Sequence, residues 1–209
     1  KTVQFWTTRG FAVLDVNHGG STAYGRDFRR RLNGAWGVVD IEDSVAGIAD
    51  LAAHGLIDAE RVVIRGGSAG GYTTLRALTA TTAFAAGTSY FGISDLVAMV
   101  EDDHKFESRY IFSMIGPWPE AETLYRDRSP INHLDTLHGE LLLLQVADDL
   151  VVKDDQATLM ADALRALGKE VELVVYPGEG HGFRRADTII DSLSRELAFY
   201  QRVFDARRC

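Results

Sequence analysis

The chain has 209 residues, enough for one sizeable domain and too few for two comfortable ones. Its 46% hydrophobic and 25% charged content is typical of a soluble globular protein rather than a disordered one. The formal net charge of −8 argues against a nucleic-acid partner, because phosphate binding needs a basic patch. No apolar run approaches the roughly 20 residues that span a bilayer, so we expect no membrane association.

Cysteine usage and the start of the chain bear on its origin. The only cysteine is Cys209, so no disulfide can form within the chain, and we expect a reducing, cytoplasmic location. No signal peptide opens the chain. It begins at Lys1 and soon enters a helix-like stretch, which suggests a piece of a longer polypeptide.

Apolar runs alternate with segments of helical periodicity from one end of the chain to the other. Runs typical of buried strands occupy Phe11–Val16, Arg61–Arg65, Phe84–Phe91, Leu141–Val146 and Val171–Tyr176. Apolar residues recur at three- and four-residue steps in the predicted helices at about Val38–Ala53, Gly70–Thr81, Gln156–Leu167 and Thr188–Phe204. Residues 21–37 are loop-like, and residues 94–130 are irregular with short helical patterns.

Strands that alternate with helices, each too apolar to face water, predict a parallel sheet covered by helices on both faces. We therefore expect one α/β domain over residues 1–209, with at least five parallel strands. No internal repeat, low-complexity tract or linker divides the chain.

The strongest local pattern is Gly66-Gly-Ser-Ala-Gly70, which has the form Gly-x-Ser-x-Gly. It follows a predicted strand directly and opens a predicted helix, as a nucleophile elbow does. In such a turn the serine is strained, and residues two positions to either side must lack bulk. Ser68 is therefore the candidate nucleophile. The N–H of Ala69, at the start of the helix, is a candidate oxyanion donor.

An acid and a histidine follow later strands in the order expected for this kind of site. The pair Asp148 and Asp149 comes just after the strand Leu141–Val146, and His181 lies in a turn-rich segment after Val171–Tyr176. The carboxyl ends of parallel strands meet at one edge, so these loops converge on Ser68. His181 would act as general base and one aspartate would orient it. The spacing alone does not choose between Asp148 and Asp149.

Other kinds of site lack support in the sequence. No His-x-x-x-His pair, cysteine pair or Asp-x-Asp-x-Asp loop suggests a metal, and no glycine-rich phosphate motif is present. We expect neither a metal nor a cofactor. The remaining histidines lack a glycine-flanked loop at a strand end, so we interpret them as surface or structural residues.

Several segments together resemble the C-terminal catalytic domain of prolyl oligopeptidase-family serine peptidases, in the bacterial dipeptidyl or acylaminoacyl peptidase branch. The segments that carry the resemblance lie along nearly the whole chain: Gln4–Asn17, Gly20–Gly25, Trp36–Asp40, Gly66–Tyr72, Leu141–Val152 and Tyr176–Phe183. The resemblance implies an α/β-hydrolase fold and hydrolysis of peptide or acyl-peptide bonds without a cofactor. It assigns the acid to Asp148, the first of the pair, and makes Phe91 and Tyr110 candidates for the substrate pocket.

The chain also departs from the family pattern. The family has further N-terminal strands, an oxyanion loop and a propeller domain upstream of the first residues here, and the resemblance implies that these are missing from this chain. His18-Gly19-Gly20 is a poor substitute for the oxyanion loop, because only one convincing helix separates it from Arg61. Three hypotheses stay open: a serine peptidase, a small-molecule carboxylesterase, and a catalytically silent fragment. A homo-oligomer is compatible with each.

Overall fold

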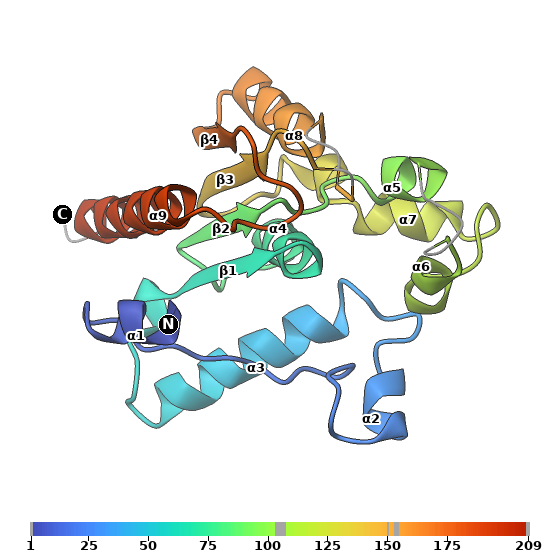
Figure 1. Ribbon diagram of the computed structural model, residues 1–209. Helices are drawn as coiled ribbons and strands as arrows, with labels where there is room; N and C mark the ends of the chain where they lie inside the picture. Colours follow the sequence, from blue (N-terminus) through green and yellow to red (C-terminus); the bar gives the residue numbers. More distant parts are fainter. Residues whose placement is uncertain (1, 103–107, 150, 153–154, 208–209) are drawn as a thin grey trace.

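Four parallel strands form the sheet at the centre of the molecule: β1 (Val63–Gly67), β2 (Ala86–Tyr90), β3 (Glu140–Val146) and β4 (Val171–Tyr176). This computed structural model describes residues 2–102, 108–149, 151–152 and 155–207. Each strand pairs with the next along the chain, in the order β1-β2-β3-β4 (Figure 1). Gly67 lies opposite Tyr90, and Val146 lies opposite Tyr176, so the four carboxyl ends share one edge.

Helices and two short 3-10 turns connect the strands. In chain order they are α1 (Thr2–Thr7), α2 (Arg26–Arg30), α3 (Val39–Ala53), η1 (Ala59–Arg61), α4 (Ala69–Ala80), α5 (Leu96–Asp102), α6 (Ser108–Met114), α7 (Glu122–Arg128), η2 (Pro130–His133), α8 (Asp155–Ala166) and α9 (Ala186–Ala206). The four long helices predicted from the sequence are confirmed, with ends shifted by at most two residues. The irregular segment 94–130 contains the three short helices α5, α6 and α7.

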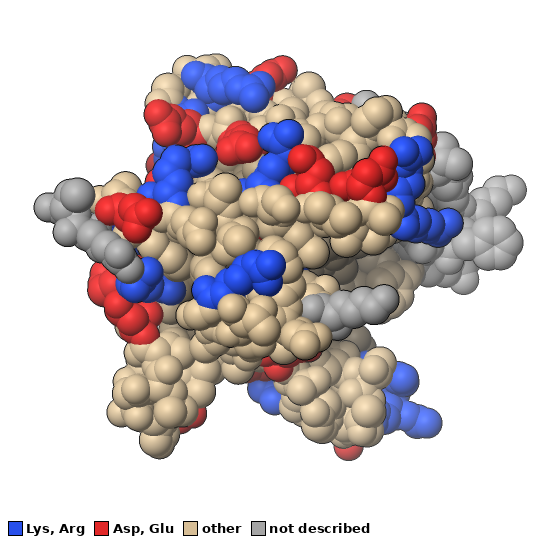
Figure 2. All heavy atoms as spheres, turned by 60° about the vertical axis from the view of Figure 1, so that its left-hand side comes forward, with Lys and Arg blue, Asp and Glu red and all other residues tan. Residues whose placement is uncertain are grey.

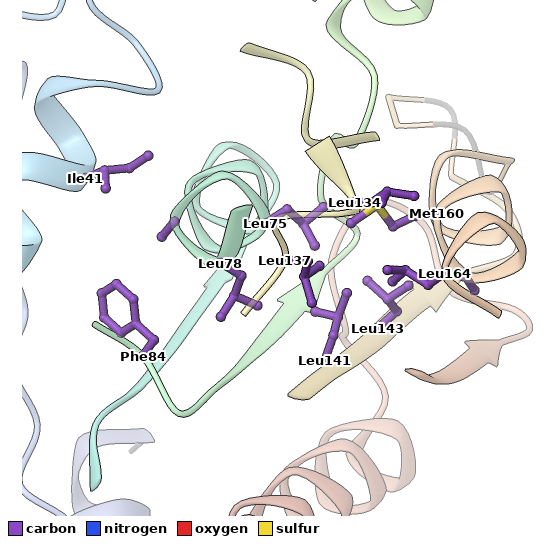
Figure 3. Close-up of a cluster of buried hydrophobic side chains, with 12 residues drawn as sticks. Ile41, Leu75, Leu78, Phe84, Leu134, Leu137, Leu141, Leu143, Met160 and Leu164 are labelled. Carbon is purple, nitrogen blue, oxygen red and sulfur yellow. The ribbon is translucent and has the colours of Figure 1, made fainter. Parts of the chain in front are cut away.

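Helices cover both faces of the sheet, as the α/β prediction requires. On one face α4 and α8 pack against the sheet and α3 packs against α4, in a cluster that includes Leu141 and Leu143 of β3 with Leu78 and Met160 (Figure 3). On the other face α9 packs against the sheet, in a cluster that includes Leu142 of β3 and Trp6 of α1. The alternation of side chains along β3 therefore divides one apolar run between two buried layers.

The predicted strand at Phe11–Val16 is wrong. Residues 11–18 run alongside α3, where Gly47 faces Leu14 and Val16, but they form no ladder with any described strand (Figure 1). Val13 and Leu14 keep 43% and 45% of their surface exposed. A strand needs a partner for its backbone N–H and C=O groups, and β1 ends the described sheet on this side. The sheet therefore has four described strands rather than five.

The surface carries both signs of charge. Figure 2 shows Lys and Arg interspersed with Asp and Glu over the face that it presents. Among the described helices, none is long and apolar enough to cross a membrane.

Candidate active site

A strained turn between β1 and α4 presents Ser68. The strand ends at Gly67, Ser68 adopts φ 55° and ψ −119°, and the helix begins at Ala69. A positive φ is unfavourable for a residue with a side chain, and such positions cost about 1–3 kcal/mol each. The turn is fixed by its surroundings, because the Ser68 N–H donates to the carbonyl of Tyr90 at 2.9 Å.

Two glycines make this turn possible. A Cβ on Gly66 would lie 2.2 Å from the carbonyl oxygen of Gly70, and a Cβ on Gly71 would lie 2.6 Å from the Cα of Gly92. A Cβ on Gly70 would meet nothing within 4 Å. The need for small residues is thus confirmed on the N-terminal side of Ser68. On the C-terminal side it falls on Gly71 rather than on Gly70.

The side chains of Ser68, His181 and Asp149 form a continuous hydrogen-bonded chain. Ser68 Oγ lies 2.8 Å from His181 Nε2, and His181 Nδ1 lies 2.8 Å from Asp149 Oδ2. The Asp149 side chain is fully buried, and its Oδ1 accepts the backbone N–H groups of Val151 and Val152 at 2.8 and 2.9 Å. These N–H groups hold the Asp149 carboxylate in place. The arrangement is that of a nucleophile, a base and an orienting acid.

The resemblance assigns the acid to Asp148, but the structure places the Asp149 side chain against His181. Asp148 is exposed, and its Oδ2 accepts the backbone N–H of Gly178 at 3.1 Å. In the turn after β3 the side chains of Asp148 and Asp149 point in different directions. The N–H groups of Val151 and Val152 hold the Asp149 carboxylate on the side that faces His181. The sequence limits the candidates for the orienting acid to Asp148 and Asp149. It does not distinguish them, because the direction of the turn depends on backbone conformation and not on residue spacing.

Phe91 and Tyr110, the two predicted pocket residues, lie in different surroundings. Phe91 follows β2 with φ 38°, and its ring packs edge-on against the His181 ring with centroids 5.0 Å apart. It therefore contacts the base directly. Tyr110 lies on α6 with 67% of its surface exposed. A place for either residue in a substrate pocket stays a prediction. His104, one of the histidines interpreted as surface or structural residues, lies outside the described residues, as does Cys209.

The Ala69 N–H is available for an incoming group. It stands at the N-terminus of α4, and no hydrogen bond to the described part of the chain occupies it. The segment His18–Gly20 makes its contacts elsewhere: the Gly19 N–H donates to Asp43 at 2.7 Å and the Gly20 N–H to the carbonyl of Phe28. These contacts give no support to His18–Gly20 as a second oxyanion donor.

A buried ionic network lies below the turn, and the sequence patterns gave no sign of it. Glu196 of α9 accepts hydrogen bonds from Arg65 Nε at 2.8 Å, from the Tyr90 hydroxyl at 2.7 Å and from the Tyr200 hydroxyl at 3.0 Å. Burial and the Glu196 carboxylate raise the pKa of Tyr90 above its ordinary value, so its hydroxyl stays a donor. Since Tyr90 also accepts the Ser68 N–H, the network links α9 to the turn.

The described residues contain no group of three or more His, Cys, Asp or Glu side chains that could hold a metal ion. Ser68, His181 and Asp149 lie together at the carboxyl edge of the sheet.

Comparison with known proteins identifies related sequences over nearly the whole chain. The family model described as "Prolyl oligopeptidase family" matches residues 1–207. The structure of a puromycin-hydrolyzing peptidase of Mycobacterium tuberculosis is 50% identical with a TM-score of 0.93, and the match covers 95% of this chain and 30% of that one. The TM-score shows that the two share an α/β-hydrolase-like fold.

Two curated relatives extend the comparison. Dipeptidyl aminopeptidase BIII of Pseudoxanthomonas mexicana is 33% identical over 190 residues, which are 88% of this chain and 28% of the relative. An acylamino-acid-releasing enzyme of Arabidopsis thaliana is 28% identical over 200 residues, which are 92% of this chain and 26% of the relative. The chain thus spans less than a third of the length of each protein that it is compared with.

Proposed function

Because the chain belongs to the prolyl oligopeptidase family of serine peptidases, we propose that it hydrolyses peptide or acyl-peptide bonds through an acyl-enzyme on Ser68. His181 is the general base and acid, and Asp149 is the orienting acid. The observation that carries this proposal is the hydrogen-bonded chain from Ser68 Oγ through both ring nitrogens of His181 to Asp149, with both joining distances at 2.8 Å.

The first half of the reaction forms the acyl-enzyme. Ser68 Oγ attacks the substrate carbonyl carbon while His181 Nε2 takes the hydroxyl proton. The carbonyl oxygen becomes an oxyanion, to which the Ala69 N–H donates a hydrogen bond. The intermediate then collapses: the C–N bond breaks, and the proton on Nε2 passes to the leaving amine.

The second half returns the enzyme to its starting state. A water molecule gives its proton to His181 Nε2 and attacks the acyl carbon. The ester bond to Ser68 breaks, and its oxygen recovers the proton. Throughout, Asp149 accepts the hydrogen bond from Nδ1, so the protonated ring is stabilised and Nε2 keeps facing the serine. The two backbone N–H groups that Asp149 Oδ1 accepts hold the carboxylate in this orientation.

The relatives suggest a substrate class. One is a puromycin-hydrolyzing peptidase, one a dipeptidyl aminopeptidase and one an acylamino-acid-releasing enzyme. Two of these names state a short unit, a dipeptidyl group or an acylamino acid, and the third states hydrolysis of puromycin. We therefore propose that the intact protein cleaves a short aminoacyl or acylaminoacyl group from an amine, and that puromycin is a suitable test substrate.

The experiment compares three substrates with the intact protein and its Ser68→Ala variant: puromycin, an aminoacyl-p-nitroanilide and p-nitrophenyl acetate. We expect hydrolysis of at least one amide substrate, and its loss in the variant. Hydrolysis of the ester alone would instead favour a carboxylesterase. A folded protein that hydrolyses none of the three and that a fluorophosphonate does not label would be catalytically silent, against the proposal.

A further inference from the structure

Glu179 is a buried carboxylate two residues before His181. It lies in the segment 177–185, which links β4 to α9, and only 3% of its surface is exposed. Its Oε2 accepts the backbone N–H of Arg184 at 3.1 Å, and its Oε1 accepts the backbone N–H of Arg185 at 3.0 Å. The side chain thus closes a ring over residues 179–185, and His181 lies inside this ring.

The ring needs such a constraint because of its composition. Glycines stand at positions 178, 180 and 182, on both sides of Glu179 and of His181. Gly178 has φ 71° and Gly182 has φ 111°, in the region that favours glycine. Glycine loses more conformational freedom on folding than any other residue. A segment with alternating glycines therefore has little preference of its own for the conformation that places His181.

The other contacts of the segment hold it at different points. Asp148 accepts the N–H of Gly178 at its start, and the Phe183 ring packs edge-on against Tyr176 with centroids 4.9 Å apart. The Phe183–Tyr176 contact also spans the histidine, but it is a contact between rings and does not fix the backbone of residues 179–185. Within the segment 177–185, Glu179 is the described side chain whose hydrogen bonds connect a residue before His181 to residues after it.

We propose that Glu179 is a positioning residue, which holds segment 179–185 so that the His181 ring stays between Asp149 and Ser68. This inference rests on the proposed function, because it requires His181 to be the catalytic base. A displacement of about 1 Å in a catalytic group can cost about 100-fold in rate. Loss of the ring is therefore expected to lower the rate of the chemical step and to leave substrate binding nearly unchanged.

A second role for Glu179 would be merely to stabilise the start of α9, and the chain offers a matched control for it. Asp187 lies in the first turn of the same helix, where its Oδ1 accepts the N–H of Thr188 at 2.9 Å and its carboxylate pairs with Arg185. It is an acid at the same helix N-terminus, but its hydrogen bonds do not span His181. Asp187→Asn removes charge from the helix end and leaves the ring closed.

The test compares the intact wild-type protein with Glu179→Gln, Glu179→Asp and Asp187→Asn. Gln keeps the size of Glu but places an NH₂ donor against one of the two N–H donors, and Asp keeps the charge on a shorter stem. The rate of fluorophosphonate labelling of Ser68 and the values of kcat and KM are measured at a temperature where thermal unfolding shows each protein to be folded.

We expect Glu179→Gln to lower kcat and the labelling rate about 10- to 100-fold, with KM within about threefold of wild type. Glu179→Asp should change them in the same direction, and Asp187→Asn should stay within about twofold. Equal labelling of Glu179→Gln and wild type would overturn the inference, as would equal losses in Glu179→Gln and Asp187→Asn. If wild type itself is not labelled, the proposed function fails, and the inference fails with it.

Discussion

Replacement of Asp149 by Asn is the most selective perturbation of the site. The Asn Oδ1 can still accept the N–H groups of Val151 and Val152, so the turn after β3 keeps its hydrogen bonds. The NH₂ group, however, now faces His181 Nδ1 at the position of Asp149 Oδ2, 2.8 Å away. Nδ1 must then be the acceptor, which places the ring proton on Nε2. In that tautomer Nε2 cannot take the proton of Ser68.

The expected loss is large because the aspartate acts on the base itself. In serine proteases the corresponding change lowers kcat by about 10⁴-fold, which corresponds to about 5.5 kcal/mol in the activation free energy. Asp148→Asn is the matched control. Asp148 is exposed, and its hydrogen bond from the Gly178 N–H can be accepted by the Asn Oδ1. We expect a change of about twofold or less.

The assay is steady-state hydrolysis of the best amide substrate by both variants, with near-ultraviolet circular dichroism as the check on folding. If Asp148→Asn lost about 1,000-fold while Asp149→Asn stayed within tenfold of wild type, the assignment of the acid from the structure would be wrong.

Further predictions concern stability. Gly66→Ala places a Cβ 2.2 Å from the Gly70 carbonyl oxygen. We expect urea denaturation to show a free energy of unfolding lower by about 1–3 kcal/mol. The control Gly70→Ala, with open space around its Cβ, should change it by no more than about 0.5 kcal/mol. Glu196→Gln breaks the ion pair with Arg65, and we expect it to lower the free energy of unfolding by about 2 kcal/mol. This is below the roughly 3–5 kcal/mol of fully buried pairs, because the Arg65 side chain is one-third exposed. The control Glu122→Gln, in an exposed pair with Arg126, should cost less than about 0.5 kcal/mol. Burial opposes ionisation of Glu179, but the backbone N–H groups that it accepts lower its pKa below the ordinary 4.5. Its contribution to stability is therefore full above pH 4.5 and is lost as the pH falls through the lower folded pKa. Urea denaturation should show wild type more stable than Glu179→Gln near neutral pH and a smaller difference in acid; a difference that grew in acid would contradict this sign.

Most of the sheet and the long helices could be predicted because their patterns are local. The run Val171–Tyr176 is a strand with the predicted ends, and α3 follows the apolar repeat that begins at Val38. The strand predicted at Phe11–Val16 has an equally apolar pattern. It does not form because a strand depends on a partner, and the partner is not a property of the segment itself.

The site was predictable to the extent that a motif fixes backbone geometry. Gly66–Gly70 placed Ser68 in the turn, and the glycine-flanked loop placed His181 beside it. Which aspartate contacts His181 depends on the direction of a turn, and the structure places Asp149 there rather than Asp148, the residue that the resemblance favours. Glu179 carries no signal in the sequence, because an isolated glutamate in a loop is usually exposed. Its burial follows from N–H groups that point inward only in the folded loop.

Formation of an acyl-enzyme on Ser68 can be observed directly in a rapid-mixing experiment. The intact protein is mixed with an excess of p-nitrophenyl acetate, quenched in acid and digested, and the peptides are analysed by mass spectrometry. We expect a burst of about one p-nitrophenol per active site and an acetyl group on the peptide that contains Ser68. Steady turnover with no burst, and an acetyl group on another residue or on none, would contradict it.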